Sequence, residues 1–435
     1  MPLTGALFSG VSGINTNGNA MNIIGDNIAN VNTVGFKSTR AVFADLLSVQ
    51  MGGAKIGTGS RLASADRIFS QGGIESTNNV TDMAIQGNGL FVLRNNEGGT
   101  FYTRAGQFNL DKRGVLVNPQ GLKVQGIQLD AAGQPVSGLT DITLNNRLLI
   151  APVATTKITL AGNFDASVAT PYLPYPTDAV GTEATSNEWF SASNFSTIVT
   201  VYDSLGDAHD LTFLFRKAAN DLWDYRVVTA SNDVTGGTPG KLIQVSDPGA
   251  ALEFNPDGTI NLGGATNVTN ITFNWNNGSN VPQVISGGVP GDLNIIDFNQ
   301  FAAPSSVSTL SQNGVKPGTL TSISIDEKGL VTGLFSSGLS QSLYRVSLAD
   351  FTNPEGLTHV GNSLFTQSSD AGEVIYGDPA TGGFGTVLSS SLELSTVDLA
   401  AEFVKMVITQ RGFQANSRTI TVTDGLLEEI ANLKR

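Results

Sequence analysis

The longest periodic pattern of apolar residues lies at the C-terminal end of the chain, in residues 389–435. Large apolar side chains recur there every seven residues, at Leu399, Met406, Phe413, Ile420 and Leu427. Because seven residues make nearly two turns of an α-helix, this spacing predicts one apolar stripe along a long helix. Ser395 followed by Asp398 has the form of a capping box, which predicts that the helix starts near Ser395. Polar residues at Gln410 and Ser417 interrupt the companion stripe, so the helix needs a partner.

A second helix with the same spacing is expected over residues 1–31. Its stripe consists of Leu7, Ile14, Met21 and Ile28. Five glycines interrupt the segment, at Gly5, Gly10, Gly13, Gly18 and Gly25. At about 1 kcal/mol each relative to alanine they cost an isolated helix roughly 5 kcal/mol, so it forms only when something packs against it. We predict that the terminal helices pair as a coiled coil and form one helical domain, residues 1–31 plus 390–435. The alternative is two core helices of a bundle, but no other long helical pattern lies between them.

Residues 32–72 are expected to form a connector. Within it, residues 41–51 predict a short helix with Phe43, Leu46 and Leu47 on one face. The glycine-rich residues 51–60 predict a loop.

The remaining pattern alternates with the period of two that is typical of β-strands, separated by Gly, Asn and Asp turns. Residues 73–149 and 311–389 have the same character and are expected to form one split β domain. Residues 150–310 are expected to form a second β domain inserted into it. The hairpin at 196–217 illustrates the pattern, with Val199 and Val201 on one face and Ile198, Thr200 and Tyr202 on the other. The predicted fold class is therefore mainly β with long terminal α-helices and nested, discontinuous domains.

Composition and charge exclude several classes of function. The chain has no cysteine, so disulfides and thiolate chemistry are ruled out. Its net charge of −13 argues against nucleic-acid binding. Most of that charge lies in residues 150–310, which hold 15 Asp or Glu against 5 Lys or Arg, a net of −10. No stretch approaches the ~18 apolar residues of a membrane span. The N-terminal residues lack the basic and apolar regions of a secretory signal peptide.

The sequence signals for a catalytic, cofactor-binding or metal site are weak. Residues 86–90 contain a G-x-G but not the third glycine of a dinucleotide site, and a hairpin turn explains it. Asp203, Asp207, His209 and Asp210 form a carboxylate–histidine cluster, but their spacing is not that of a calcium loop. Aspartates at a hairpin turn explain this cluster better than a metal does. The 37 acidic residues leave a glycosidase-like carboxylate pair open, although nothing singles one out. We expect no catalytic, cofactor-binding or metal site.

Several motifs resemble the axial family of bacterial flagellar rod and hook proteins. The segment ANVNTVGFKSTR, residues 29–40, is similar to that family's N-terminal signature. The matching residues are Asn27, Ala29, Asn30, Asn32, Thr33, Gly35, Phe36 and Lys37. Residues 74–93, 102–126 and 348–373 resemble its β core, and residues 392–433 resemble its closing helix. Ser395-Thr396 stands where the family usually has Ser-Asn, which affects only the local cap. The resemblance covers most of the chain, in the right order.

The resemblance implies a structural subunit rather than an enzyme. The large insertion at 150–310 points to the hook, a self-assembling tube that works as a flexible universal joint and transmits motor torque from rod to filament. The implied partners are further copies of the chain, the flagellar rod proteins, the hook cap, the hook-associated proteins and the type III export apparatus. The implied location is extracellular, in the hook distal to the basal body, after export without a cleaved signal peptide. The alternatives are a distal rod or hook-associated protein, or a secreted β-rich adhesin or enzyme.

Overall fold

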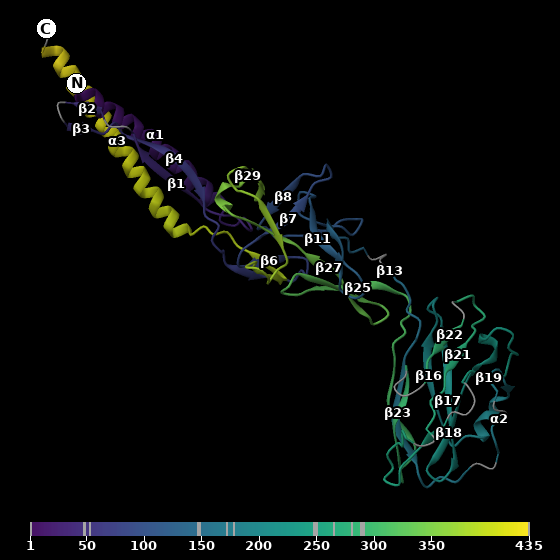
Figure 1. Ribbon diagram of the computed structural model, residues 1–435. Helices are drawn as coiled ribbons and strands as arrows, with labels where there is room; N and C mark the ends of the chain where they lie inside the picture. The colour runs from purple at the N-terminus through teal and green to yellow at the C-terminus, as the bar shows by residue number, and fades with distance from the viewer. Residues whose placement is uncertain are drawn as a thin grey trace. The chain divides into compact units, whose positions relative to one another are not determined.

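A computed structural model shows that the chain forms two compact units (Figure 1). It describes residues 2–46, 49–51, 54–145, 149–170, 173–176, 179–246, 251–263, 266–279, 282–287 and 292–433. Unit 1 comprises Met1–Asn146, Thr321–Leu334 and Ser340–Arg435, and unit 2 comprises Arg147–Leu320 and Phe335–Leu339. The predicted fold class, mainly β with two terminal helices that pair, is confirmed. The division into four domains with a connector at 32–72 stays a prediction.

The two long helices of unit 1 are α1 (Pro2–Ala29) and α3 (Leu399–Leu433), which lie side by side (Figure 1). The N-cap of α3 is Asp398, whose Oδ1 accepts hydrogen bonds from the backbone N–H groups of Ala400 (2.9 Å) and Ala401 (3.2 Å). The prediction that this helix starts at Ser395 is therefore wrong. The backbone N–H of Thr396 donates to the carbonyl of Phe36 at 3.1 Å, which holds the chain extended before Asp398.

A two-stranded ribbon follows α1, where the sequence predicted a short helix and a loop. Strand β1 (Thr39–Asp45) pairs with β4 (Ser60–Arg67), and β2 (Val49–Met51) pairs with β3 (Ala54–Ile56). The helix prediction is wrong for the described residues, which exclude Leu47, and the predicted loop contains β3. An isolated ribbon is marginally stable, but this one lies on α1. The backbone N–H of Ser60 donates to Ser12 Oγ at 3.2 Å, and Thr16 Oγ1 donates to the Ser60 carbonyl at 3.1 Å.

The other strands of unit 1 come from both sides of unit 2 in the sequence. Before unit 2 they are β5 (Ile74–Ser76), β6 (Met83–Gln86), β7 (Leu90–Arg94), β8 (Thr100–Thr103), β9 (Asn109–Leu110), β10 (Leu116–Val117), β11 (Lys123–Leu129) and β12 (Pro135–Asp141). After it come β25 (Gly318–Ile325), β26 (Leu330–Phe335), β27 (Ser340–Val346), β28 (Leu348–Phe351), the 3₁₀ turn η2 (Pro354–Gly356), β29 (Thr358–Gly361), β30 (Leu364–Thr366), β31 (Val374–Gly377), β32 (Thr386–Ser389) and β33 (Ser391–Glu393).

These two sets of strands interleave in the main sheet, which runs β26-β27-β11-β7-β8-β30-β29. Strand β11 pairs with β27, and β8 pairs with β30 so that Tyr102 lies opposite Phe365. Smaller sheets join β6 to β32 and β5 to β33. Tyr102 also packs edge-on against Phe351 in the buried core. Neither set of strands can form this core alone.

Unit 2 is built from two main sheets and a short helix. Its elements are β13 (Leu149–Ile150), β14 (Ile158–Asp165), β15 (Glu183–Ala184), α2 (Ser186–Ser191), β16 (Phe195–Tyr202), β17 (Ala208–Ala219), β18 (Leu222–Ala230), the 3₁₀ turn η1 (Ser231–Asp233), β19 (Leu242–Gln244), β20 (Ala251–Glu253), β21 (Ile271–Phe273), β22 (Gln283–Ile285), β23 (Leu293–Phe301) and β24 (Ser306–Gln312). One sheet runs β15-β19-β18-β17-β16 and the other β23-β14-β24.

Aromatic side chains form the core of unit 2. The ring of Phe164 stacks on Phe298, with 4.4 Å between centroids, and on Trp223, with 4.7 Å. The predicted hairpin alternation is confirmed, because Val199 is fully buried whereas Ile198 is 57% exposed. Because most of this core lies within residues 147–320, unit 2 is nearly contiguous in the sequence.

An acid-sensitive contact in unit 2 gives a testable prediction. Hydrogen bonds from the Ser231 hydroxyl and from Thr238 lower the pKa of Glu183 to about 2. A lowered carboxyl pKa stabilises the folded state above the unfolded value of 4.5, and this contribution is lost as the pH falls from there toward about 2. We expect Glu183→Gln to lower the free energy of unfolding at neutral pH and to make its dependence on acidic pH shallower.

Urea titrations of the full chain, followed by tryptophan fluorescence, check this prediction, because all three tryptophans lie in unit 2. The control is Asp292→Asn, at an exposed carboxylate that has no side-chain hydrogen bond within the described residues. An acid dependence in Glu183→Gln as steep as in the wild type would contradict the prediction.

Candidate assembly site

The terminal helices α1 and α3 pack antiparallel in a single register. Four pairs of facing positions define it: Gly10 with Ile420, Gly13 with Asn416, Asn17 with Gly412, and Asn27 with Glu402. Over these four pairs the residue number rises by 17 along α1 and falls by 18 along α3, which is the pattern of two antiparallel helices. The two ends of the chain therefore form one helical pair.

Two glycines of α1 allow the helices to approach closely. A Cβ atom added at Gly13 would lie 2.4 Å from Asn416 Nδ2, and one added at Gly10 would lie 2.9 Å from Ile420 Cγ1. By contrast, nothing lies within 4 Å of a Cβ added at Gly5, Gly18 or Gly25. The contact with α3 thus explains two of the five glycines, and three face open space.

The predicted apolar stripes lie partly within this contact. Half-buried stripe residues are Leu7, Ile14, Met21, Ile28, Met406, Ile420 and Leu427. Leu399 and Phe413 are 39% and 38% exposed. That these nine residues carry assembly stays a prediction.

The most deeply buried positions of the helical pair include polar residues that the apolar pattern missed. They include Ala20, Ile24 and Asn27 on α1, and Glu402 and Thr423 on α3. On α3, Glu402, Thr409, Asn416 and Thr423 recur every seven residues. A search for polar residues at that spacing would have found this second seam, because heptad positions a and d need not both be apolar.

Much of the apolar surface of α3 does not contact α1. Its exposed large apolar side chains include Phe403, Val404, Val407, Ile408, Val422, Leu426 and Ile430. Their exposed fractions run from 44% at Leu426 to 63% at Ile408. These side chains fall into two groups along α3, one at residues 403–408 and one at residues 422–430.

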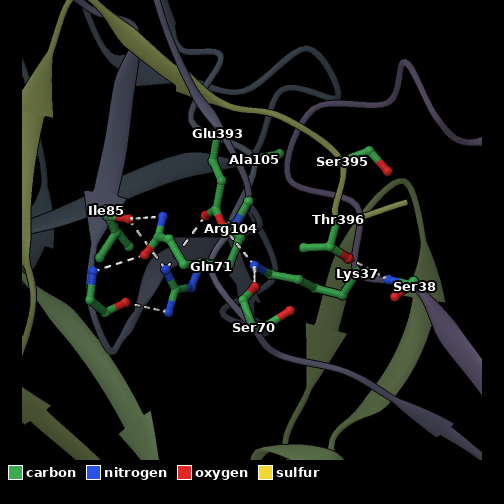
Figure 2. A network of polar contacts seen from close by, with 12 residues as sticks. Lys37, Ser38, Ser70, Gln71, Ile85, Arg104, Ala105, Glu393, Ser395 and Thr396 are labelled. Atoms are coloured by element: carbon green, nitrogen blue, oxygen red, sulfur yellow. Dashed lines mark hydrogen bonds and ion pairs between the residues drawn. The ribbon is translucent and has the colours of Figure 1, made fainter. Parts of the chain in front are cut away.

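The base of α3 is fixed to the β core of unit 1 by a buried ionic cluster, here called the Glu393 clamp. It consists of Lys37, Arg104 and Glu393. Figure 2 shows both cations directed toward the Glu393 carboxylate. Lys37 Nζ lies 2.7 Å from Glu393 Oε1, and Arg104 Nη1 lies 3.5 Å from Glu393 Oε2. The backbone N–H of Gly72 donates to Oε1 at 2.7 Å. The side chains of Lys37 and Glu393 are fully buried.

Burial dominates the electrostatics of the Glu393 clamp. It lowers the pKa of Lys37 and that of Arg104, while the Glu393 carboxylate opposes both shifts. Lys37 Nζ also donates to the carbonyl of Ser70 at 2.5 Å. Because charges in a dry interior are costly unless they are paired, Lys37 depends on this carboxylate, and Arg104 depends on it more than on Asp350.

Residues of the N-terminal motif run alongside the Glu393 clamp. The backbone N–H of Gly35 donates to the Glu393 carbonyl at 2.8 Å, and that of Ser38 donates to Thr396 Oγ1 at 2.9 Å. Gly35 has φ +66°, and a Cβ there would lie 2.5 Å from the Ala105 nitrogen, so only glycine fits.

Other motif residues end α1 and fill the space beneath it. Asn30 Nδ2 donates to the carbonyl of Asp26 at 2.9 Å, and Thr33 Oγ1 donates to Asn30 Oδ1 at 3.1 Å. Phe36 is buried beneath the guanidinium of Arg67, whereas Asn32 is exposed. The structure therefore brings Gly35 and Phe36 to the base of α3 and leaves Asn32 at the surface.

The carboxylate–histidine cluster lies in unit 2 and is explained by hydrogen bonds. Asp203 Oδ1 accepts from the backbone N–H of Asp207 at 2.9 Å, which closes the turn between β16 and β17. His209 Nε2 lies 3.3 Å from Asp203 Oδ2, and its ring stacks on Trp275. Asp210 accepts from a threonine of β16 at 2.7 Å. Within the described ranges, no group of three or more His, Asp or Glu side chains could hold a metal ion.

The close approach of α1 to α3 predicts the effect of a substitution at Gly13. We expect Gly13→Leu to separate the helices, because its side chain would overlap Asn416. The control is Gly18→Ala, which has open space and gains about 1 kcal/mol of helix propensity. Far-UV circular dichroism of the full chain should show less helix in Gly13→Leu and at least wild-type helix in Gly18→Ala. Equal helix content in the two variants would count against the contact.

Removing the single anion of the Glu393 clamp should destabilise unit 1. Glu393→Gln leaves the Lys37 cation buried without a counter-ion and leaves Arg104 with only the weaker influence of Asp350, which costs about 3–5 kcal/mol. The control is Asp378→Asn, which breaks the surface pair with Arg345, where both side chains are about 30% exposed, and costs at most about 1 kcal/mol. Calorimetric unfolding of the full chain measures the stability of both variants. A Glu393→Gln variant as stable as the Asp378→Asn control would contradict the stabilising role of the Glu393 clamp.

Four family models match the chain in sequence order. They are the flagella basal body rod protein model (residues 7–37), the flagellar hook protein FlgE/F/G D1 domain (84–164), the flagellar basal body protein FlaE D2 domain (163–315) and the flagellar basal body rod FlgEFG protein C-terminal model (388–433). Among the helices that the structure describes, none has the length and hydropathy to cross a membrane.

Similarity to proteins named flagellar hook protein FlgE extends over the whole chain. The relative from Escherichia coli is 34% identical, covering 99% of this chain and 100% of its own. Those from Borreliella burgdorferi and Salmonella typhimurium are each 33% identical, covering 99% and 98% of both chains respectively. The chain therefore belongs to the flagellar hook protein family, which consists of structural proteins of the flagellum and not of enzymes.

Proposed function

We propose that this chain is the repeating subunit of the flagellar hook and that its α1–α3 pair assembles against the pairs of neighbouring copies. The observation that carries the proposal is the exposed apolar surface of α3. Phe403, Val404, Val407 and Ile408 are each about half exposed or more, within two turns of one helix. Burying the exposed parts of these four side chains contributes about 3–6 kcal/mol per subunit. This gain favours association with other copies.

A groove between the helices supports the same assembly. It has a volume of about 670 Å³ and is lined by residues of both helices, including Ile14, Gly18, Met21, Gln410 and Phe413. Gly18 has open space above it, so a side chain of a neighbouring copy fits there. The half-exposed stripe residue Phe413 would then be covered on assembly.

The domain order supports a layered tube. We propose that residues 1–31 plus 390–435 form its inner wall, residues 73–149 plus 311–389 the middle layer and the acidic residues 150–310 the outer layer, with 32–72 as connector. Such a tube would serve as a flexible universal joint between rod and filament. The similarity to hook proteins over the full chain favours the hook over a distal rod or hook-associated protein.

The proposed partners follow from this place in the flagellum. They are the rod proteins, the hook cap, the hook-associated proteins and the type III export apparatus, which would deliver the chain unfolded to the outside of the cell. An α1 that depends on α3 suits such delivery, because the helix forms only after both ends have arrived.

Charging the exposed surface of α3 tests the proposal. We expect Val404→Asp together with Ile408→Asp to leave the monomer folded but to abolish polymerisation, because two buried carboxylates cannot be accommodated. The control is Val136→Asp, at an equally exposed valine of β12. Sedimentation and electron microscopy of the purified full chain give the readout. Normal tubes from the double variant, with the wild type also forming tubes, would contradict this use of α3.

A further inference from the structure

Four asparagines of the chain are followed directly by a glycine: Asn17, Asn88, Asn277 and Asn313. In such a pair the backbone nitrogen of the glycine can attack the side-chain amide carbon of the asparagine, because glycine has no Cβ to hinder the approach. The attack also needs both groups to be free to meet. Since all four asparagines precede glycine, the local structure decides which of them reacts.

Hydrogen bonds hold two of these asparagine side chains, Asn17 and Asn277. Asn17 lies inside α1, and its Nδ2 donates to the carbonyl of Gly13 at 2.8 Å. Asn277 Nδ2 donates to Asp203 Oδ2 at 2.5 Å and to Asp207 Oδ2 at 2.9 Å. The Oδ1 of Asn277 accepts from the backbone N–H two residues further on, at 3.1 Å. Neither side chain can turn toward its glycine without losing these bonds.

Asn313 is held at the side chain and at the attacking nitrogen. Its Oδ1 accepts from the backbone N–H groups of Thr156 (2.9 Å) and Lys157 (2.8 Å), and its Nδ2 donates to Thr156 Oγ1 at 2.8 Å. The N–H of Gly314 donates to Gln312 Oε1. Both groups that would have to react are therefore already engaged.

Asn88 differs from the other three asparagines. It is exposed in the bend between β6 and β7. Within the part of the chain that the structure describes, neither its side chain nor the N–H of Gly89 has a hydrogen-bond partner. The preceding Gly87 is anchored, because its N–H donates to Gln71 Oε1 at 2.9 Å and its carbonyl accepts from Arg104 Nη2 at 2.7 Å. The two groups that would react are thus free, on a bend whose position is fixed.

We propose that Asn88–Gly89 is a site of self-modification, at which the chain converts its own asparagine to aspartate or isoaspartate. The Gly89 nitrogen forms a bond to Asn88 Cγ, and the amide nitrogen leaves as ammonia with the proton of the Gly89 N–H. Water then opens the resulting succinimide ring at either of its carbonyl carbons. One water is consumed and one ammonia is released, with no oxidant or reductant. This proposal does not rest on the proposed function.

The modification would change the surroundings of the Glu393 clamp. Asn88 and Gly89 line a cleft together with Arg104 and Asp350, so either product adds a carboxylate there. Isoaspartate also adds a carbon atom to the main chain, directly after the glycine whose carbonyl accepts from Arg104. Conversion to isoaspartate is therefore expected to weaken the hold of the bend on Arg104.

Peptide mapping by mass spectrometry tests the proposal on the purified full chain. The chain is incubated folded and, in parallel, unfolded in urea, at mildly alkaline pH in heavy-oxygen water, which labels only residues converted during the incubation. A hydrogen bond that must break first slows the attack about fivefold, and three slow it about 100-fold. In the folded chain Asn88 should therefore convert at least about 100-fold faster than Asn277 or Asn313. In urea all four sites should convert at similar rates.

Asn88→Gln is the matched control. It keeps the amide and the charge but lengthens the side chain, so that the attack would have to form a larger ring, and labelling of that peptide should be lost. The incubation runs until the unfolded chain has converted. Conversion of Asn277 or Asn313 in the folded chain as fast as that of Asn88 would overturn the proposal. An Asn88 that converts only in urea would overturn it as well, because the bend would then hold the two groups apart.

Discussion

The architecture of unit 1 depends on one buried carboxylate. Glu393 is the last residue of the β core before α3, and it receives Lys37 from the N-terminal motif and Arg104 from the strand β8 region. A buried charge without a partner is far more costly than a surface charge, so the three side chains are expected to become buried together. The Glu393 clamp therefore fixes where the N-terminal segment lies relative to the C-terminal helix, and with it the register of the helical pair.

That register leaves α3 with two different faces. Toward α1 it presents Gly412, Asn416 and Ile420, and the glycines of α1 let the two backbones approach closely. Away from α1 it presents Phe403, Val404 and Ile408 to solvent. Contacts with other copies would bury apolar side chains that the contact with α1 leaves in solvent, which favours association.

The sequence was sufficient to predict the fold class, the pairing of the terminal helices and the alternation of the 196–217 hairpin, because each depends on local periodicity. It failed where distant residues override local spacing. The helix predicted over residues 41–51 is wrong because its first part lies in β1, for which β4 and α1 supply partners. The second seam of α3 was missed because Glu402 and Thr423 are polar. Glu393 carried no local signal at all, since its role depends on Lys37 and Arg104, which are distant in the sequence.

The same long-range dependence sets an order of folding. Unit 2 is almost contiguous in sequence, so its core needs neither terminus. Unit 1 needs strands that lie before and after unit 2 in the sequence. Its Glu393 clamp also needs Glu393, which lies near the C-terminal end of the chain, just before α3. Contacts of such large sequence separation form late, because the entropy of closing the loop must be lost before they stabilise anything. The pairing of α1 with α3 is therefore expected to form after the core of unit 2.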